Sequence, residues 1–410
     1  MNHCKDRVNL WGTLMGFEKD VGETPIAVVA GVDVNGLGVV RSLGGAGVRL
    51  VAIDTDLAKP TMGTRFGRKL QVPSLVGESF IVSLLDLAKD LRQKPVLFLT
   101  QEESVAAVSA ARERVLAFYH FSMPEQRVMQ MLMDKALFQK TAETLNCPVP
   151  RAVLVSSNED MTAIEALRFP CVLKPLTKDP AYGRIFAKAY RISSALEVAR
   201  LWSEIGKVVS EVIVQEWIEG GDSDVYFCLQ YRRSGEQAVS FVGRKTCQWP
   251  PLVGGTACCV PAPEAHDELT ALTNAFFDAV GFVGLGSMEY KRDPRDNKFY
   301  MVEPTVGRTD YQEEIATLNG VNIPLAAFLG ELGRTAPKSS KGSGPRGWRD
   351  PIASQKATQA GAFDDVARIA PKARICDSYF RIDDLAPYVR LKCQPLSKRL
   401  TRFLAHPTHA

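Results

Sequence analysis

Apolar runs alternate with amphipathic segments in the first third of the chain, which predicts a parallel α/β domain. Three runs are apolar and short enough to be buried strands, and segments of helical period separate them. The expected strands are at 25–31, 48–54 and 95–100, and the expected helices are near 39–43 and at 77–91 and 102–118. Strands that alternate with helices favour a doubly wound parallel sheet. We therefore expect a Rossmann-like domain over residues 25–122, after a lead-in at 1–24.

The pattern changes at Pro124, where antiparallel strand signals mix with helices. Helices are expected at 128–145, 194–206 and 267–282, strands at 169–176, 212–231 (interrupted by GGDSD) and 238–246, and a loop or strand at 252–260. Such a mixture is typical of an α+β fold, so we expect a second domain over residues 123–332. Residues 333–410 are expected to be a Gly/Pro/Ser/Lys-rich linker and a basic C-terminal segment. Parts of this segment, WRDPIAS and FRIDDLAPYVRL, are expected to pack back on the core.

The stretch Gly284–Arg308 predicts a β-hairpin that carries two acids. Two apolar runs flank the charged turn KRDPRDNK, and each run holds one carboxylate, Glu289 or Glu303. Folding about the turn would set both carboxylates on the same side, where a divalent cation would offset their repulsion. Mg²⁺ favours a pair of carboxylates plus nucleotide phosphates, and Arg308 would then reach a phosphate oxygen. A surface hairpin with two solvated acids is the alternative interpretation.

Composition and charge fit an ordinary globular protein. The 410 residues are 46% hydrophobic and 23% charged, and the longest apolar runs are too short to span a bilayer. The nine cysteines form no CxxC pair, which indicates reduced thiols and a cytoplasmic location. Residues 334–410 carry 15 Lys and Arg against 6 Asp and Glu, yet no basic motif with interleaved aromatics supports nucleic-acid binding. The oligomeric state is left open, with a homo-oligomer among the alternatives.

The corner GVDVNGLG after the first strand is rich in glycine. Such corners bring backbone N–H groups and a helix N-terminus toward an anion. Gly31, Gly36 and Gly38 do not have the GxGxxG spacing of dinucleotide-binding proteins. A tight turn in a doubly wound sheet and a ligand-binding role are both consistent with the corner.

Four features in sequence order resemble the ATP-grasp superfamily, and specifically its carboxylate–amine ligases of the D-aspartate-ligase-like type. They are Lys135 after an acid in MDKALFQKTAETLNCPVP, Lys174 at the end of a strand, the segment QEWIEGGD, and the acidic hairpin. The residues GRK and the pair Pro250–Pro251 resemble the narrower subgroup. The resemblance covers about residues 25–330. It implies an ATP-grasp fold of two α+β lobes behind the doubly wound domain, and a ligase that uses ATP and Mg²⁺ or Mn²⁺.

The resemblance also implies roles for individual residues. Lys135 and Lys174 would bind nucleotide phosphates. The backbone of Glu216, Trp217 and Ile218 would pair with the adenine edge, and the Trp217 side chain would lie beside the ring. Glu219, Asp222 or Asp224 would bind the ribose hydroxyls. Glu289 and Glu303 would hold Mg²⁺, while Arg308, Arg244 and Lys245 would be catalytic, stabilising charge on the transferred phosphoryl group.

Two departures from the family pattern qualify these roles. Thr305 stands where the family usually has Asn, so a hydroxyl would ligate the second metal position or its water. The phosphate-covering loop after Lys174 has one glycine, so its closure would rely on Lys178, Arg184 or Lys188.

The expected reaction joins a small-molecule carboxylate to an amine through an acyl phosphate. The substrate contacts are expected from the first domain and from loops 60–66 and 248–256. Three alternatives stay open: a nucleotide-binding protein without ligase activity, a Rossmann-type oxidoreductase, and carboxylation or phosphoribosylamine chemistry on the same fold.

Overall fold

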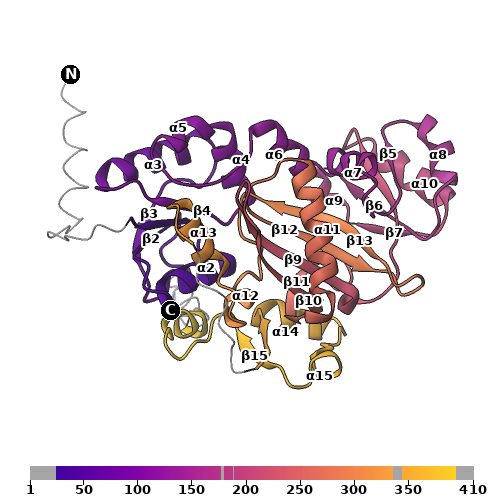
Figure 1. The fold of residues 1–410 in the computed structure, drawn as a ribbon. Helices are drawn as coiled ribbons and strands as arrows, with labels where there is room; N and C mark the ends of the chain where they lie inside the picture. Colours follow the sequence, from indigo (N-terminus) through magenta and orange to yellow (C-terminus); the bar gives the residue numbers. More distant parts are fainter. Residues whose placement is uncertain (1–24, 177–179, 188, 336–343, 394–410) are drawn as a thin grey trace, which may run out of the picture.

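The computed structural model describes residues 25–176, 180–187, 189–335 and 344–393. It contains three sheets, arranged as an N-terminal domain, a small lobe and a large central sheet (Figure 1). Two expectations lie outside the described residues: the lead-in at 1–24, and the side chains of Lys178 and Lys188. Within the described ranges, no helix combines the length and the apolar character that crossing a bilayer requires.

The N-terminal domain is the expected parallel α/β unit. Its four parallel strands have the order β3-β2-β1-β4. The elements are β1 (Ala27–Ala30), α2 (Val34–Gly45), β2 (Leu50–Asp54), β3 (Arg68–Gln71), α3 (Gly77–Asp90), β4 (Val96–Leu99), α4 (Glu102–Ala110) and α5 (Arg112–Leu116). The corner after β1 needs its glycines, because a Cβ at Gly36 would lie 2.0 Å from the Gly31 carbonyl oxygen. The expected helix at 102–118 is interrupted at Ala111, and β3 was not predicted.

Two short helices connect this domain to the small lobe. The expected helix at 128–145 divides into α6 (Gln126–Met133) and α7 (Lys135–Thr144). Asp134 separates them because its carboxylate caps α7, accepting a hydrogen bond from the Leu137 N–H at 2.8 Å. Lys135 is therefore the first residue of a helix.

The small lobe is a four-stranded antiparallel sheet with the order β5-β8-β6-β7. Its elements are β5 (Ala152–Val155), α8 (Met161–Glu165), β6 (Cys171–Pro175), α9 (Pro180–Ile185), β7 (Tyr190–Ile192), α10 (Ala195–Ile205) and β8 (Val212–Glu216). Leu173, Val214 and Trp202 belong to its own hydrophobic core. The lobe stands at the far end of the molecule from the N-terminal domain (Figure 1).

The central sheet has seven strands in the order β13-β12-β9-β10-β11-β14-β15. They are β9 (Val225–Arg232), β10 (Val239–Trp249), β11 (Gly255–Pro261), β12 (Gly284–Arg292), β13 (Phe299–Val306), β14 (Arg346–Arg349) and β15 (Arg374–Asp377). The helices around the sheet are α11 (His266–Ala279), α12 (Glu314–Leu318), α13 (Ile323–Glu331), α14 (Pro351–Gln359) and α15 (Val366–Ile369). Residues 252–260, expected to be a loop or a strand, lie mostly in β11.

Alternation along the central strands divides the core into two layers. On β9, Tyr226 and Cys228 pack with Phe276 of α11, whereas Phe227 and Leu229 pack with residues of α2, α12 and α13. The second layer joins the central sheet to the N-terminal domain through one continuous core. The site described below lies on this second face of the sheet.

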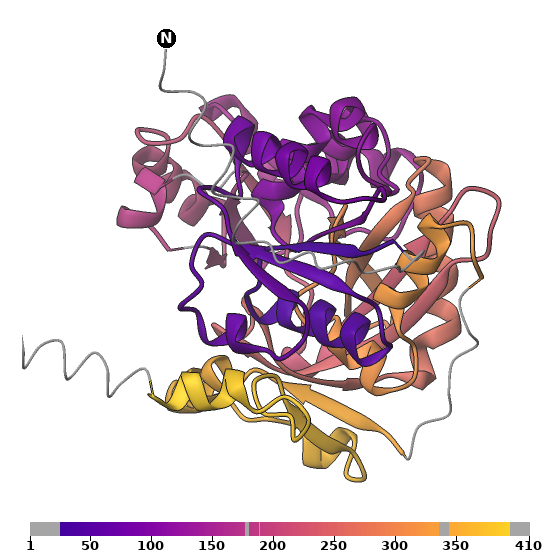
Figure 2. The same ribbon diagram turned by 90° about the vertical axis from the view of Figure 1, so that its left-hand side faces the viewer.

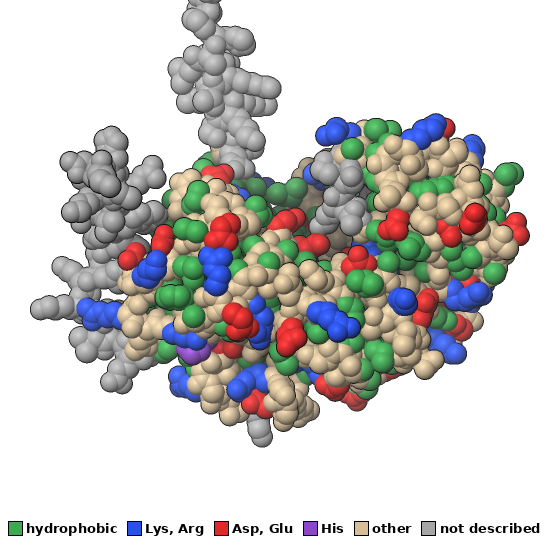
Figure 3. Space-filling view, turned by 90° about the horizontal axis from the view of Figure 1, so that it is seen from above, with side chains coloured by type: hydrophobic (Ala, Val, Ile, Leu, Met, Phe, Trp, Pro, Cys, Tyr) green, Lys and Arg blue, Asp and Glu red, His purple; other side chains and the backbone are tan. Residues whose placement is uncertain are grey.

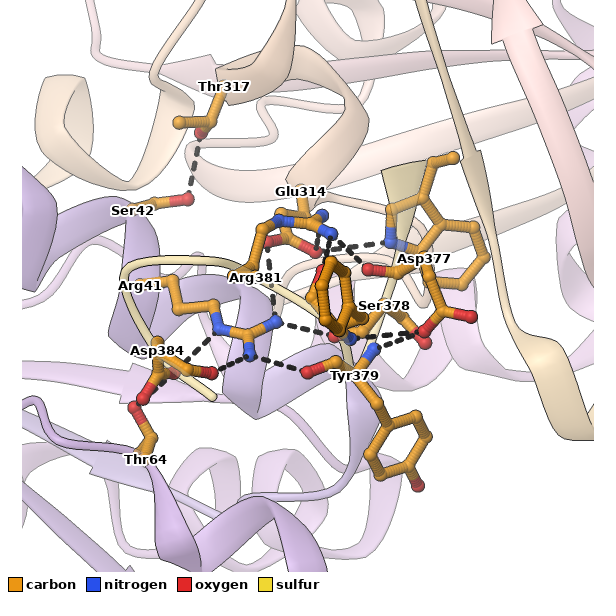
Figure 4. A network of polar contacts seen from close by, with 12 residues as sticks. Arg41, Ser42, Thr64, Glu314, Thr317, Asp377, Ser378, Tyr379, Arg381 and Asp384 are labelled. Carbon is orange, nitrogen blue, oxygen red and sulfur yellow. Dashed lines mark hydrogen bonds and ion pairs between the residues drawn. The ribbon is translucent and has the colours of Figure 1, made fainter. Parts of the chain in front are cut away.

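The C-terminal segment is more structured than the expected linker and basic tail. β14 pairs with β11, and the fully buried Trp348 lies opposite Cys259, so WRDPIAS packs on the core as expected. The segment runs beneath the N-terminal domain (Figure 2). There Arg41 of α2 bonds Asp384 at 2.8 Å and the carbonyl oxygens of Ser378 and Tyr379, while Arg381 pairs with Glu314 (Figure 4).

Candidate functional site

A cavity of about 650 Å³ lies between the small lobe and the central sheet. The molecular surface is hollowed at this place (Figure 3). Most of the predicted site residues line it: Lys135, Lys174, Glu216, Trp217, Ile218, Lys245, Glu289, Glu303, Thr305 and Arg308. These residues come from α7, the small-lobe sheet and the segment after β8, the central sheet, and the segment that follows β13. The fold thus gathers positions up to 173 residues apart.

The acidic hairpin has the predicted geometry. β12 and β13 are antiparallel neighbours, and Glu289 lies directly opposite Glu303. Directly opposite side chains project from the same face of an antiparallel pair, and here both reach the cavity. Burial raises the pKa of the Glu289 carboxyl, and the nearby Asp310 and Glu303 raise it further, although Lys245 opposes them.

Lys245 is the counter-charge of Glu289. Its Nζ lies 2.6 Å from Glu289 Oε2 and 3.2 Å from Gln248 Oε1. The lysine side chain is almost fully buried. A buried ammonium needs such partners, and these hold it at the wall of the cavity.

The carboxylate pair fits a magnesium ion that is shared with substrate phosphates. Within the described residues, no three Asp, Glu, His or Cys side chains form a complete metal cage. Mg²⁺ does not need one, because it commonly takes one or two carboxylates and completes its shell with phosphate oxygens and water. Glu289 and Glu303 would supply those carboxylates. The hydroxyl of Thr305, two residues along the same strand, also lines the cavity.

Lys174 is held by a relay of glutamines that the sequence analysis did not assign. Its Nζ donates to Gln215 Oε1 at 3.3 Å, and Gln215 Nε2 donates to Gln139 Oε1 at 3.0 Å. Gln139 in turn donates to the Pro150 carbonyl oxygen at 2.7 Å. Both glutamines are buried and line the cavity. The relay links β6, β8 and α7, and so fixes where the Lys174 ammonium lies.

The hinge residues Glu216, Trp217 and Ile218, at the end of β8 and just after it, line the cavity, but two of their predicted contacts need correction. The Trp217 N–H donates to the Pro170 carbonyl oxygen at 2.9 Å, so it is not available to an adenine edge. The Trp217 ring is also covered, because Lys291 Nζ lies 4.6 Å from its centroid. The Glu216 carboxylate accepts from the Arg168 N–H at 3.0 Å.

Lys291 is a cavity residue that the sequence analysis missed. It is 8% exposed, and burial lowers the pKa of its ammonium, although Asp224, Asp222 and Glu219 oppose this shift. The signal was present in the sequence. A residue two positions after Glu289 on a strand faces the same side, which makes Lys291 a second charged group on that face.

Arg244 does not belong to the cavity. Successive residues of β10 face opposite sides, so Lys245 reaches the cavity while Arg244 lies over the Tyr226 ring, 4.9 Å from its centroid. The Arg244 guanidinium donates to the Ser223 carbonyl oxygen and lies 3.7 Å from Asp224. The structure therefore does not support a catalytic role for Arg244.

None of the three ribose candidates is among the described residues that line the cavity. Asp224 pairs with Arg244 and with Arg292, and Glu219 lies 3.5 Å from Arg191. Asp222 accepts three hydrogen bonds from Gln248 and Leu252. These carboxylates shape the protein around the site. Arg184, a candidate for loop closure, is exposed on α9 and is also not among the lining residues.

Asp310 is a further acid at the cavity wall. It accepts from Ser287 Oγ at 2.9 Å and from Gln312 Nε2 at 3.1 Å. Behind it lies Glu313, which is 2% exposed and whose Oε1 has no hydrogen-bond partner among the described residues. Burial raises the pKa of the Glu313 carboxyl to about 8, and the charge of Asp310 adds to the shift.

The comparisons with known proteins agree with this geometry. No family model matches the chain. It is 26% identical over 191 residues to a D-alanine–D-alanine ligase of Pseudomonas putida, and 25% identical over 240 residues to that of Pseudomonas fluorescens. The first match covers 44% of this chain and 57% of the ligase, and the second covers 52% and 67%. The chain thus spans little more than half the length of the P. putida ligase.

Solved structures extend the similarity over most of the fold. N5-carboxyaminoimidazole synthetase of Staphylococcus aureus aligns with a TM-score of 0.61 at 16% identity, covering 80% of this chain and 83% of that one. The biotin carboxylase domain of Hydrogenobacter thermophilus 2-oxoglutarate carboxylase, in complex with MgADP, aligns at 0.59 and 15% identity, covering 77% and 71%. The chain therefore shares the fold of these ATP-grasp enzymes. The resemblance inferred from the sequence motifs is confirmed at this level.

Proposed function

We propose that the protein is an ATP-dependent carboxylate–amine ligase. The carboxylate would attack the γ-phosphorus of ATP to give an acyl phosphate and ADP. The amine would then attack the acyl carbon and displace phosphate, leaving an amide. No covalent enzyme nucleophile is needed for this sequence. The observation that carries the proposal is the cavity in which Glu289 and Glu303 face each other, close to the ammonium of Lys245.

The residues around the cavity divide naturally into phosphate-binding and metal-binding groups. Lys135 and Lys174 come from the side of α7 and the small lobe, where they would neutralise phosphate oxygens as point charges. Glu289 and Glu303 would hold Mg²⁺, which offsets the negative charge that builds up on the phosphates. The hinge residues Glu216 to Ile218 would lie beside the base.

Lys245 and Arg308 would stabilise charge at the reacting end. Lys245 is fixed by Glu289 and Gln248, so its ammonium is positioned before substrate arrives. Arg308 follows β13, and its guanidinium donates to the Thr309 carbonyl oxygen at 3.1 Å. Fixed donors aimed at developing charge cost no reorganisation during the reaction.

Inorganic phosphate released from MgATP tests the proposal. Pairs of amino acids and simple amines would be supplied, with bicarbonate as an additional carboxylate because one matched structure contains a bicarbonate anion. We expect release that requires both a carboxylate and an amine. Nucleotide binding without substrate-dependent release would favour the non-catalytic alternative, and tight nicotinamide binding would favour the oxidoreductase.

A further inference from the structure

The loop between β10 and β11 has a fixed shape and an apolar tip. Asp222 holds its start, because one carboxylate accepts from the backbone N–H groups of Gln248 at 2.8 Å and Leu252 at 2.7 Å. The loop then folds back tightly, since a Cβ at Gly254 would lie 2.0 Å from the carbonyl carbon of Trp249. Only glycine permits this return.

Leu252 at the tip adopts a backbone conformation that is unfavourable for its side chain. Its φ is +68°, in the left-handed region where a branched residue is strained. The side chain gains little burial in return, because 47% of it is exposed, and the neighbouring Val253 is 38% exposed. Both side chains line the cavity. Strain kept without compensating packing is typical of a position that meets a ligand.

The same contacts tie the loop to the reacting end of the cavity. Gln248 donates to Asp222 at 3.0 Å and accepts from Lys245 at 3.2 Å, and Lys245 pairs with Glu289. The tip is therefore held at a set position relative to the acidic pair. An apolar surface beside these charged groups suits a substrate that has an ionised reacting group and an apolar remainder.

We propose that Leu252 and Val253 select a substrate with an aliphatic or aromatic side chain, which packs on them while its carboxylate or amine reacts. This inference rests on the proposed ligase function. Apolar contact of this kind discriminates between substrates by the apolar surface that they bury. Each methylene that the pocket accommodates changes kcat/KM by about 10- to 200-fold.

Leu252→Gly provides the test, because glycine removes the side chain and adopts φ +68° without strain. Phosphate release from MgATP would be measured with leucine and phenylalanine, and with serine and aspartate, each paired with a common amine or carboxylate. We expect the wild type to favour the apolar substrates by at least about 10-fold in kcat/KM. The variant should lose this preference through a raised KM for leucine, with no fall in its thermal midpoint.

Two further variants separate specificity from folding. Leu252→Asn also tolerates a positive φ and should behave like the glycine variant. Leu196→Ala removes an apolar side chain that is 81% exposed on α10, away from the lining residues, and should keep the wild-type preference. Equal preference in the wild type and Leu252→Gly, or a wild-type preference for serine and aspartate, would overturn the inference.

Absence of phosphate release with every pair would count against the ligase function instead. Ligand binding would then decide whether Leu252 and Val253 select an apolar side chain. Millimolar leucine should raise the thermal midpoint of the wild type more than serine does, and this difference should vanish in Leu252→Gly. If the wild type responds equally to both amino acids, the apolar wall does not select ligands.

Discussion

Removing the Arg41 guanidinium should loosen the C-terminal segment from the N-terminal domain. Arg41 and Asp384 are 6% and 1% exposed at their side chains, and their closest atoms are 2.8 Å apart. Arg41→Met would leave Asp384 buried, and among the described residues it would keep the hydrogen bonds from Thr64 Oγ1 and the Arg65 N–H, each 2.8 Å long. Breaking a buried pair by removing one partner costs about 3–5 kcal/mol. We expect the lower end, about 3 kcal/mol, because these two bonds remain.

Thermal unfolding measures this cost. An unfolding entropy of about 2.1 cal/mol/K per residue over the whole chain converts 3 kcal/mol into a midpoint that is lower by about 4 °C. Arg114→Met is the matched control, since Arg114 pairs with Glu78 on the surface, where both side chains are at least half exposed. That variant should stay within about 1 °C of the wild type. An Arg41→Met midpoint equal to the control's would refute the assignment of a stabilising buried pair.

Three further outcomes follow from single side chains. Glu313→Gln should stabilise the protein at pH 8.5 but not at pH 4. Because the pKa of Glu313 is raised in the folded state, wild-type stability falls by up to about 1.4 kcal/mol per pH unit as pH rises from the unfolded-state pKa toward 8. Thermal midpoints measured across this pH range would show the fall. Gln215→Leu removes one acceptor of Lys174 and should raise the KM for ATP, as steady-state kinetics would show, more than it changes the thermal midpoint. Lys291→Met keeps the packing against Trp217 but removes the charge, and it should weaken nucleotide binding at least several-fold, as measured by calorimetry. Unchanged affinity would mean that Lys291 does not contact the bound nucleotide.

Local patterns in the sequence predicted the central part of the site. Alternation and the charged turn placed Glu289 opposite Glu303, since strand period and turn position are local properties. The same rule applied to β10 would have separated Arg244 from Lys245, because adjacent strand residues face opposite sides. The error with Arg244 therefore came from carrying over a motif without following its alternation.

Contacts between distant segments could not be predicted in this way. The Asp222 carboxylate meets Gln248, and Gln215 meets Gln139, through pairings that depend on how the sheets and helices pack. β14 joins β11 from beyond a polar, glycine-rich stretch whose composition indicates only a linker. The sequence predicted that WRDPIAS packs on the core, but not that Trp348 would reach the core on a strand paired with Cys259 of β11.

Magnesium-dependent nucleotide binding tests the central claim most directly. Calorimetric titration of ATP with and without Mg²⁺ would compare the wild type with Glu303→Gln, and Glu236→Gln would serve as a control on the exposed turn after β9. We predict that Mg²⁺ strengthens ATP binding to the wild type and the control. In Glu303→Gln the magnesium-dependent increase in affinity should be smaller by a factor of at least about ten, equivalent to about 1.4 kcal/mol. Equal magnesium-dependent affinity in Glu303→Gln and the wild type would contradict the assignment of the acidic hairpin as the metal–nucleotide site.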